Sequence, residues 1–181
     1  ASCGSSPTGK AAGAILAHAQ NNTINYNTFS GNTADGNQAA GGALLYRFFS
    51  GNNFSYNSIT GNKSDQSGAV YLLGDISLGN LIASHNNITA NGRLNITGQD
   101  RSLFLNASTT AYFQNTHWGG QTATGDGSAS EKCSMLIFDS ETNGGSSCTG
   151  STSGTIDVTG AVATAWPLCS ASSSLDCVGA P

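Results

Sequence analysis

A repeat of about 29 residues, within the range typical of stacked repeat architectures, is the feature that most restricts how this chain can fold. Four stretches resemble one another, and an asparagine recurs at their second position at nearly constant intervals. Repeats of this kind bury a continuous core only by stacking on their neighbours, so the sequence indicates a stacked architecture. The four stretches are Tyr26 to Asn32, Tyr56 to Asn62, His85 to Asn91 and Gln114 to Gly120.

The content of each unit favours strands over helices. Short apolar runs, such as Ala43 to Tyr46 and Phe54 to Ile59, are separated by Gly, Asn and Asp turns. Leucine-rich, ankyrin and tetratricopeptide repeats of similar length need a helix in each unit, and no unit shows helical spacing of apolar residues. The hexapeptide rhythm of the left-handed form is also absent. The sequence therefore predicts an all-β fold, a right-handed parallel β-helix of about four coils.

Composition excludes several classes of partner. Only 9% of the residues are charged, and six Lys and Arg leave a net charge of −4. Without a basic patch, neither nucleic acid nor an anionic membrane is expected to bind. No apolar run reaches the ~18 residues that a spanning helix needs, so membrane insertion is not expected. The start at Ala1-Ser2-Cys3 is typical of a mature end after signal-peptide removal, or of a fragment, and predicts an extracellular or cell-surface location.

The second-position asparagines are expected to form an inward structural ladder. Like residues stack about 4.8 Å apart in parallel coils, and an inward Asn can hydrogen-bond to the coils on both sides. None of these asparagines begins an N-x-S/T sequon, which agrees with burial. Phe29, Ile59 and Ile88 are expected to stack as a core column. The predicted ladder is Asn27, Asn57, Asn86 and Asn115.

These motifs carry a family resemblance. Gly41-Gly42-Ala43-Leu44 and Phe29-Ser30-Gly31-Asn32 resemble the Gly-Gly-Ala-Ile and Phe-x-x-Asn repeats of polymorphic outer-membrane protein type surface proteins, within the parallel β-helix repeat superfamily. The stretch Asn115 to Gly120 is similar to the Asn-x-x-Trp-Gly close of the last coil in many such domains. The resemblance covers about residues 11–120. It implies a fold rather than one function, because the superfamily includes lyases, adhesins and scaffolds.

The chain divides into coils over residues 1–120 and a loop-rich, cysteine-containing C-terminal extension of the same domain over residues 121–181. In the extension, Thr155 to Val162 alternates as a strand does, with no partner identifiable from sequence. The apolar-poor tail predicts disulfides rather than a metal site, since no cysteine pair has CxxC spacing. The predicted disulfides are Cys133–Cys148 and Cys169–Cys177, with Cys3 unpaired or bonded to another chain.

Six N-x-S/T sequons favour a eukaryotic secretory route and covalently attached glycan. Those outside the ladder and in exposed positions should carry it, with Asn53, Asn95 and Asn106 as the first expectations. The six candidates are Asn21, Asn53, Asn62, Asn87, Asn95 and Asn106.

No set of catalytic residues, metal ligands or cofactor-binding residues emerges from the sequence. Asp35 and Asp65 lie about one repeat apart, so they could stack and hold Ca²⁺, but two solvated turn residues explain them as well. Tyr26 and Tyr56 could form an aromatic platform for sugar, or simply pack across coils. The dipeptide His117-Trp118 could mark a sugar-binding edge, or close the last coil.

We therefore expect a non-enzymatic, secreted or cell-surface structural glycoprotein that associates with itself into a fibre or an adhesin-type stalk. Residues 1–10 lack the features of a capping helix, so the first coil should be open to head-to-tail addition of another copy. The strand at Thr155 to Val162 and the odd cysteine could also join neighbours. The alternatives are a polysaccharide-binding or polysaccharide-degrading β-helix protein and, less favoured, an ice-binding protein.

Overall fold

All the described strands pair in parallel, and the described part of the chain contains no helix. The strands are two to four residues long and fall into four sheets. The computed structural model describes residues 13–18, 20–35, 41–47, 51–64, 70–73, 81–94, 103–106, 110–119, 137–139, 155–157, 160, 162–170 and 177–179.

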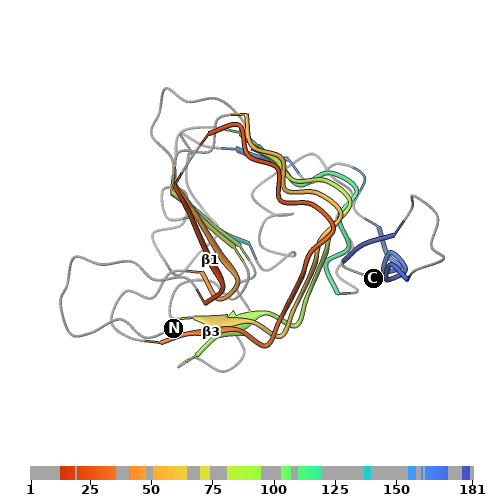
Figure 1. The fold of residues 1–181 in the computed structure, drawn as a ribbon, viewed down its shortest axis with the longest axis horizontal. Coiled ribbons are helices and arrows are strands. Elements are labelled where there is room, and N and C mark those ends of the chain that lie inside the picture. Colours follow the sequence, from red (N-terminus) through yellow and green to blue (C-terminus); the bar gives the residue numbers. More distant parts are fainter. Residues whose placement is uncertain are drawn as a thin grey trace.

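Each sheet is assembled from segments that lie far apart in sequence. The chain passes through one sheet after another and then returns to the first, pairing with the strand it left about one repeat earlier. Strands of the same sheet therefore lie one behind another in sequence order, as the colours in Figure 1 show. We call one such passage a circuit. The five-stranded sheet consists of β1 (Ile15–His18), β4 (Leu44–Arg47), β7 (Val70–Leu73), β11 (Leu103–Asn106) and β13 (Ile137–Asp139).

The other three sheets have three strands each. One contains β2 (Thr28–Ser30), β5 (Ser58–Thr60) and β9 (Asn87–Thr89). A second contains β3 (Thr33–Ala34), β6 (Lys63–Ser64) and β10 (Gly92–Arg93), and the third contains β8 (Leu81–Ile82), β12 (Thr110–Tyr112) and β14 (Thr155–Asp157).

The C-terminal extension adds strands to sheets that the repeats begin. Strand β13 pairs with β11, and β14 pairs with β12. The strand expected near Thr155 to Val162 thus has a partner within its own chain: Thr155 pairs with Thr110, and Val162 forms a bridge to His117. The expectation that this strand joins a neighbouring molecule is therefore not needed to account for its pairing.

The core is built from inward side chains that repeat from circuit to circuit. Phe29 pairs with Ile59 and Ile59 with Ile88, and all three are buried, which confirms the predicted core column. Phe54 is also fully buried and contacts Phe29, with ring centroids 6.1 Å apart. Burying a side chain of this size stabilises the fold by about 1.5–3 kcal/mol, so stacked columns of them can support short strands.

Spacing between circuits is regular on one side of the molecule and variable on another. In the β2–β5–β9 sheet, Thr28 pairs with Ser58 and Ser58 with Asn87, so successive intervals are nearly equal. In the five-stranded sheet, Leu44 pairs with Val70 and Val70 with Leu103, so the second interval is clearly longer than the first. The number of residues between successive strands of the five-stranded sheet therefore varies, whereas the number between β2, β5 and β9 is almost constant.

Candidate functional site: asparagine columns, an aromatic column and a C-terminal strap

The first asparagine column consists of Asn27, Asn57 and Asn86. The backbone N–H of Asn27 donates to Oδ1 of Asn57 at 2.9 Å, and that of Asn57 donates to Oδ1 of Asn86 at 2.8 Å. Asn57 and Asn86 are fully buried, whereas Asn27 is half-buried. Three of the four predicted ladder residues therefore stack inward.

The carboxamides of Asn57 and Asn86 reach back to the preceding circuit with both of their polar atoms. While Oδ1 of Asn57 accepts the N–H of Asn27, its Nδ2 donates to the carbonyl of Ile24 at 2.9 Å. In the same way, Nδ2 of Asn86 donates to the carbonyl of Phe54 at 3.0 Å. Each side chain thus satisfies one buried donor and one buried acceptor of the bend before it, and the bonding has a single direction along the stack.

Asn115 does not continue this column, which corrects the fourth rung of the predicted ladder. A parallel bridge joins Asn87 to His117, so the residue aligned with Asn86 is Thr116, which is fully buried. Asn115 instead aligns with His85 and shares its positive φ. The register follows the burial of Phe113 and Trp118, because a one-residue slip would turn both rings outward. The similar motifs of the third and fourth repeats align Asn115 with Asn86, so motif comparison alone does not reveal this shift of one residue.

A second asparagine column is formed by Asn32, Asn62 and Asn91, the seventh residues of the first three repeats. Oδ1 of Asn62 accepts the N–H of Asn32 at 2.9 Å, and Oδ1 of Asn91 accepts that of Asn62 at 3.0 Å. The Nδ2 atoms again reach back, from Asn62 to the carbonyl of Phe29 and from Asn91 to that of Ile59. Sequence reasoning missed this column, although its constant spacing was a usable signal.

An aromatic column made of Tyr26, Tyr56 and His85 runs along the outside of the same bends. The ring of Tyr56 lies between the other two, with centroid distances of 5.0 Å to each and interplanar angles of 8° and 16°. All three residues have φ between 55° and 59°, which directs their side chains outward. Tyr56 has a ring on both faces, so it offers no open face for a sugar, whereas Tyr26 is 38% exposed and has a ring on one face among the described residues.

The described C-terminal residues 162–170 and 177–179, which we call the strap, run back beside the repeats on this side. Val162 donates its N–H to the carbonyl of Thr116, and Nδ1 of His117 lies 2.9 Å from the Val162 carbonyl oxygen. Further along, Gly179 donates its N–H to the carbonyl of Tyr56 at 2.9 Å. The strap therefore starts beside the fourth repeat and ends beside the first two, where Gly179 lies against Thr28 and Ser58.

The disulfide Cys169–Cys177 closes the strap, as the sequence predicted. A parallel bridge between Leu168 and Val178 lies next to it, and Val178 is fully buried. Gly179 has φ of +80°, and a Cβ on it would approach Oγ1 of Thr28 to 2.7 Å, so no other residue fits without a shift. The other predicted disulfide, Cys133–Cys148, and the odd Cys3 lie outside the described residues.

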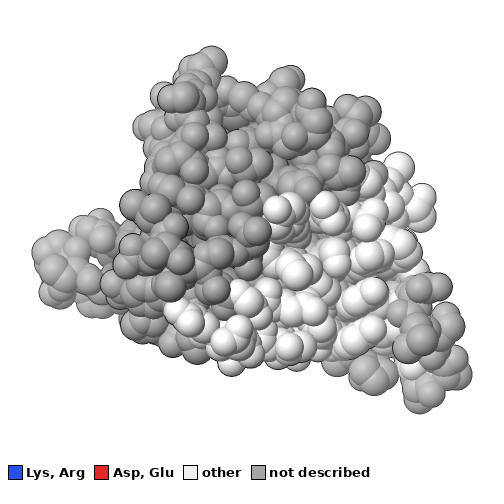
Figure 2. Space-filling view, turned by 90° about the horizontal axis from the view of Figure 1, so that it is seen from above, with Lys and Arg blue, Asp and Glu red and all other residues white. Residues whose placement is uncertain are grey.

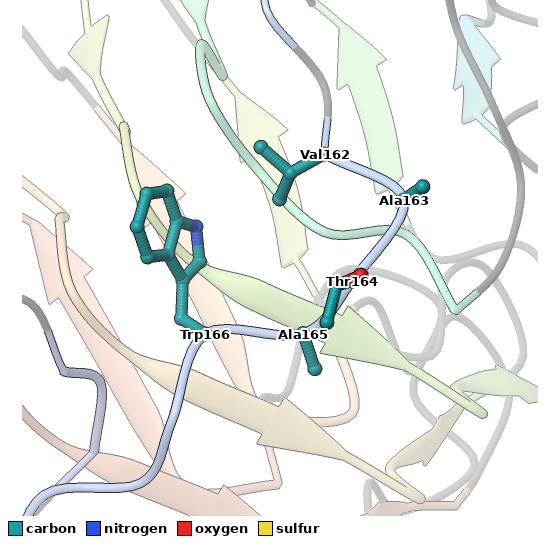
Figure 3. Close-up of a pocket in the computed structure, with 5 residues that line it drawn as sticks. All are labelled: Val162, Ala163, Thr164, Ala165 and Trp166. Atoms are coloured by element: carbon teal, nitrogen blue, oxygen red, sulfur yellow. The ribbon is translucent and has the colours of Figure 1, made fainter.

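Trp166 anchors the middle of the strap. Its N–H donates to Oδ1 of Asn87 at 3.0 Å, and its carbonyl accepts from Nδ2 of Asn87 at 2.8 Å. The indole Nε1 donates to the carbonyl of Asn115 at 2.8 Å, and the ring contacts His85 at 5.2 Å. Trp166 thus extends the aromatic column where the fourth repeat supplies Asn115 instead of a ring. Figure 3 shows the strap bending around a pocket at this point, lined by residues 162–166.

The sequon asparagines differ in accessibility. Asn62 and Asn87 are buried, and Nδ2 of each is held in hydrogen bonds, so neither has room for a glycan in the folded chain. Asn21 is exposed, and Asn53 is half-buried with its Oδ1 accepting from Ser55 Oγ. Asn106 lies in β11, and Asn95 is outside the described residues.

Charged groups are sparse on the described surface. The visible face in Figure 2 shows no charged residue among those described. Asp35 is exposed, but its predicted partner Asp65 is outside the described residues, so the Ca²⁺ alternative stays untested. Within the described ranges there is no cluster of three His, Cys, Asp or Glu that could hold a metal ion, and no helix long and apolar enough to cross a membrane.

His117 and Trp118 are both buried, at 8% and 3% exposure, so they do not present an open edge for sugar. Trp118 contacts Phe113, with ring centroids 5.9 Å apart. The indole therefore belongs to the core of the fourth repeat.

Comparison with known proteins finds no match among protein-family models, curated proteins or solved structures. Function is therefore inferred from the arrangement of the described side chains.

Proposed function

We propose that this chain is a non-enzymatic structural module that stacks end to end with further copies of itself into an extracellular fibre or stalk. Its architecture in this proposal is a right-handed parallel β-helix of about four coils over residues 1–120, with residues 121–181 as an extension of the same domain. The parallel sheets and the asparagine columns support this architecture.

The direction of the asparagine bonds is the observation that carries the proposal. Inside the columns, every Oδ1 accepts a backbone N–H from the circuit before it. At the start of the columns, the Oδ1 atoms of Asn27 and Asn32 have no such donor among the described residues. A further circuit from a second copy would supply N–H groups at both positions and lengthen both columns by the same rule. Head-to-tail contacts of this kind do not close, so they produce filaments.

The sides of the module are arranged differently from its end. The strap covers outward positions of the β2–β5–β9 sheet, including Ser58 and Asn87 at 7% exposure each. This cover leaves the β2–β5–β9 sheet without the open flat array that ice binding needs. The disulfide favours an oxidising, extracellular setting, and the accessible sequons Asn21 and Asn53 are the positions for solubilising glycan.

Sedimentation velocity and negative-stain microscopy over a range of concentrations test the proposal. We expect concentration-dependent linear assemblies, shortened by the double substitution Asn27→Ala and Asn32→Ala. Ile82→Thr is the matched control, because Ile82 is 51% exposed on the side of the module and should leave assembly unchanged. A protein that stays monomeric at high concentration, or one whose assembly ignores the double substitution, contradicts the proposal.

A further inference from the structure

A pocket of about 400 Å³ lies inside the bend of the strap, between the arms that carry Val162 and Trp166 (Figure 3). It is lined by these two residues and by Ala163, Thr164 and Ala165. We propose that this pocket is a binding subsite for one uncharged pyranose ring of an oligosaccharide, with Trp166 as the stacking surface. The inference goes beyond the proposed structural role, since it concerns the side of the module and not its ends.

The indole is fixed in position before any ligand arrives. The two backbone hydrogen bonds to Asn87 and the Nε1 bond to Asn115 hold the residue, and the ring of His85 packs against it. Binding would therefore not have to order this side chain, which removes one of the usual entropic costs of association. Trp166 is half-buried, and part of its surface lines the pocket.

The surroundings of the Trp166 ring differ from those of the Tyr56 ring in the aromatic column beside it. Tyr56 is covered on both faces by Tyr26 and His85, so no further ring can stack on it. Trp166 meets a ring at His85 and also borders the pocket, so it is the member of this group that can accept a partner there.

The chemistry of the lining selects the ligand. An aromatic face carries negative charge density and attracts the polarised C–H bonds of a pyranose. The other described lining side chains are Val, two Ala and one Thr, so this part of the pocket offers an apolar wall with the hydroxyl of Thr164 to orient the ring. None of the described lining residues is cationic, so among them an anionic sugar would lose hydration without gaining a partner. A neutral sugar therefore fits better than a uronate.

Titration of the full chain with oligosaccharides, followed by intrinsic fluorescence and calorimetry, tests the site. The probes are cellohexaose and laminarihexaose as neutral ligands, hexagalacturonate as the anionic ligand, and phenol as a simple aromatic ring. We expect saturable binding of at least one neutral hexamer, weakened about tenfold or more by Trp166→Ala. Leu168→Ala is the control, because Leu168 is 63% exposed on the strap but does not line the pocket.

Because Trp166→Ala could detach the strap, Val162→Leu provides a second variant, which enlarges the side chain that points into the bend in Figure 3 and leaves the Trp166 contacts in place. Loss of binding in this variant, together with unchanged affinity in the Asn27→Ala and Asn32→Ala protein, supports a site on the side that is independent of assembly. The inference is overturned if neither neutral hexamer binds at about 5 mM, a concentration near the weak limit of specific recognition. It is equally overturned if binding survives both pocket variants, or if hexagalacturonate or phenol binds more tightly.

Discussion

The repeat bends and the strap lie side by side, but they are stabilised in opposite ways. In the bends, the same two hydrogen bonds recur from circuit to circuit, made by Asn57 and Asn86 in one column and by Asn62 and Asn91 in the other. In the strap, every contact occurs once: one disulfide, one glycine whose positive φ and close neighbours disfavour any other residue, and one tryptophan.

This difference determines how the repeat bends and the strap should respond to amino-acid substitution. A bend residue is bonded to the circuit before it and the circuit after it, so its loss weakens the whole stack. Strap residues bond to the stack from outside the two asparagine columns, so the loss of one should open the strap and leave the stack folded. Substitutions in the two regions should therefore affect different observables.

The largest effect is expected for Asn62→Asp. Asn62 is fully buried, and its Nδ2 donates to the carbonyl of Phe29. The substitution replaces this donor with a buried carboxylate, which should lower the free energy of unfolding by roughly 3–5 kcal/mol at neutral pH. Burial raises the folded-state pKa of such a carboxyl above its unfolded value near 3.9, so the lost stability should return partly as pH falls through the raised value. Urea unfolding at several pH values measures this, and a pH-independent loss would contradict it.

Asn57→Ala should have a smaller effect, about 1–3 kcal/mol, because it leaves the N–H of Asn27 and the carbonyl of Ile24 without their partners and introduces no charge. Asn27→Ala is the matched control from the same column, because the Asn27 side chain has no preceding described circuit to satisfy. Chemical unfolding of both variants measures the difference. Equal losses of unfolding free energy in the two variants would show that the direction of the hydrogen bonds has no effect on stability.

Removing the disulfide should open the strap more than it unfolds the stack. The loop closed by Cys169–Cys177 has a sequence separation of 8, for which loop entropy gives roughly 2.5 kcal/mol of local stabilisation. With both cysteines changed to Ser, the N–H groups of Val178 and Gly179 should exchange with solvent much faster, while the main unfolding midpoint changes little. Gly179→Ala should give the same pattern with the disulfide intact. Loss of protection at Asn57 and Asn86 in either variant would mean that the strap and the stack unfold together.

Glycosylation should have the smallest effect on stability and should distinguish the sequons by position. In a eukaryotic secretory host, Asn21 and Asn53 should carry glycan, whereas Asn62 and Asn87 should not. Site-resolved mass spectrometry of the secreted protein measures occupancy, and Thr23→Ala should remove the glycan at Asn21 alone. Folded, secreted protein that carries glycan at Asn62 would be incompatible with the second asparagine column.

Several features of the described part were predictable from the sequence alone: its all-β, parallel character, the core column of Phe29, Ile59 and Ile88, and the disulfide Cys169–Cys177. These follow from local and periodic information. Apolar residues at a constant interval must stack if the repeats stack, and two nearby cysteines in an apolar-poor tail can pair with little loss of entropy. The column of Asn27, Asn57 and Asn86 was found for the same reason, because its spacing matches the length of one circuit.

Features that depend on register, or on contacts across many residues, became visible only in the folded chain. Thr116 rather than Asn115 follows Asn86 because Phe113 and Trp118 must both point inward, a condition that motif similarity does not express. The burial of Asn62 in a second column, despite its sequon, depends on bonds to Asn32 and Asn91 in neighbouring circuits. The placement of Trp166 against Asn87, far away in sequence, comes from the return path of the strap, and a path of that kind leaves no periodic signal in the sequence.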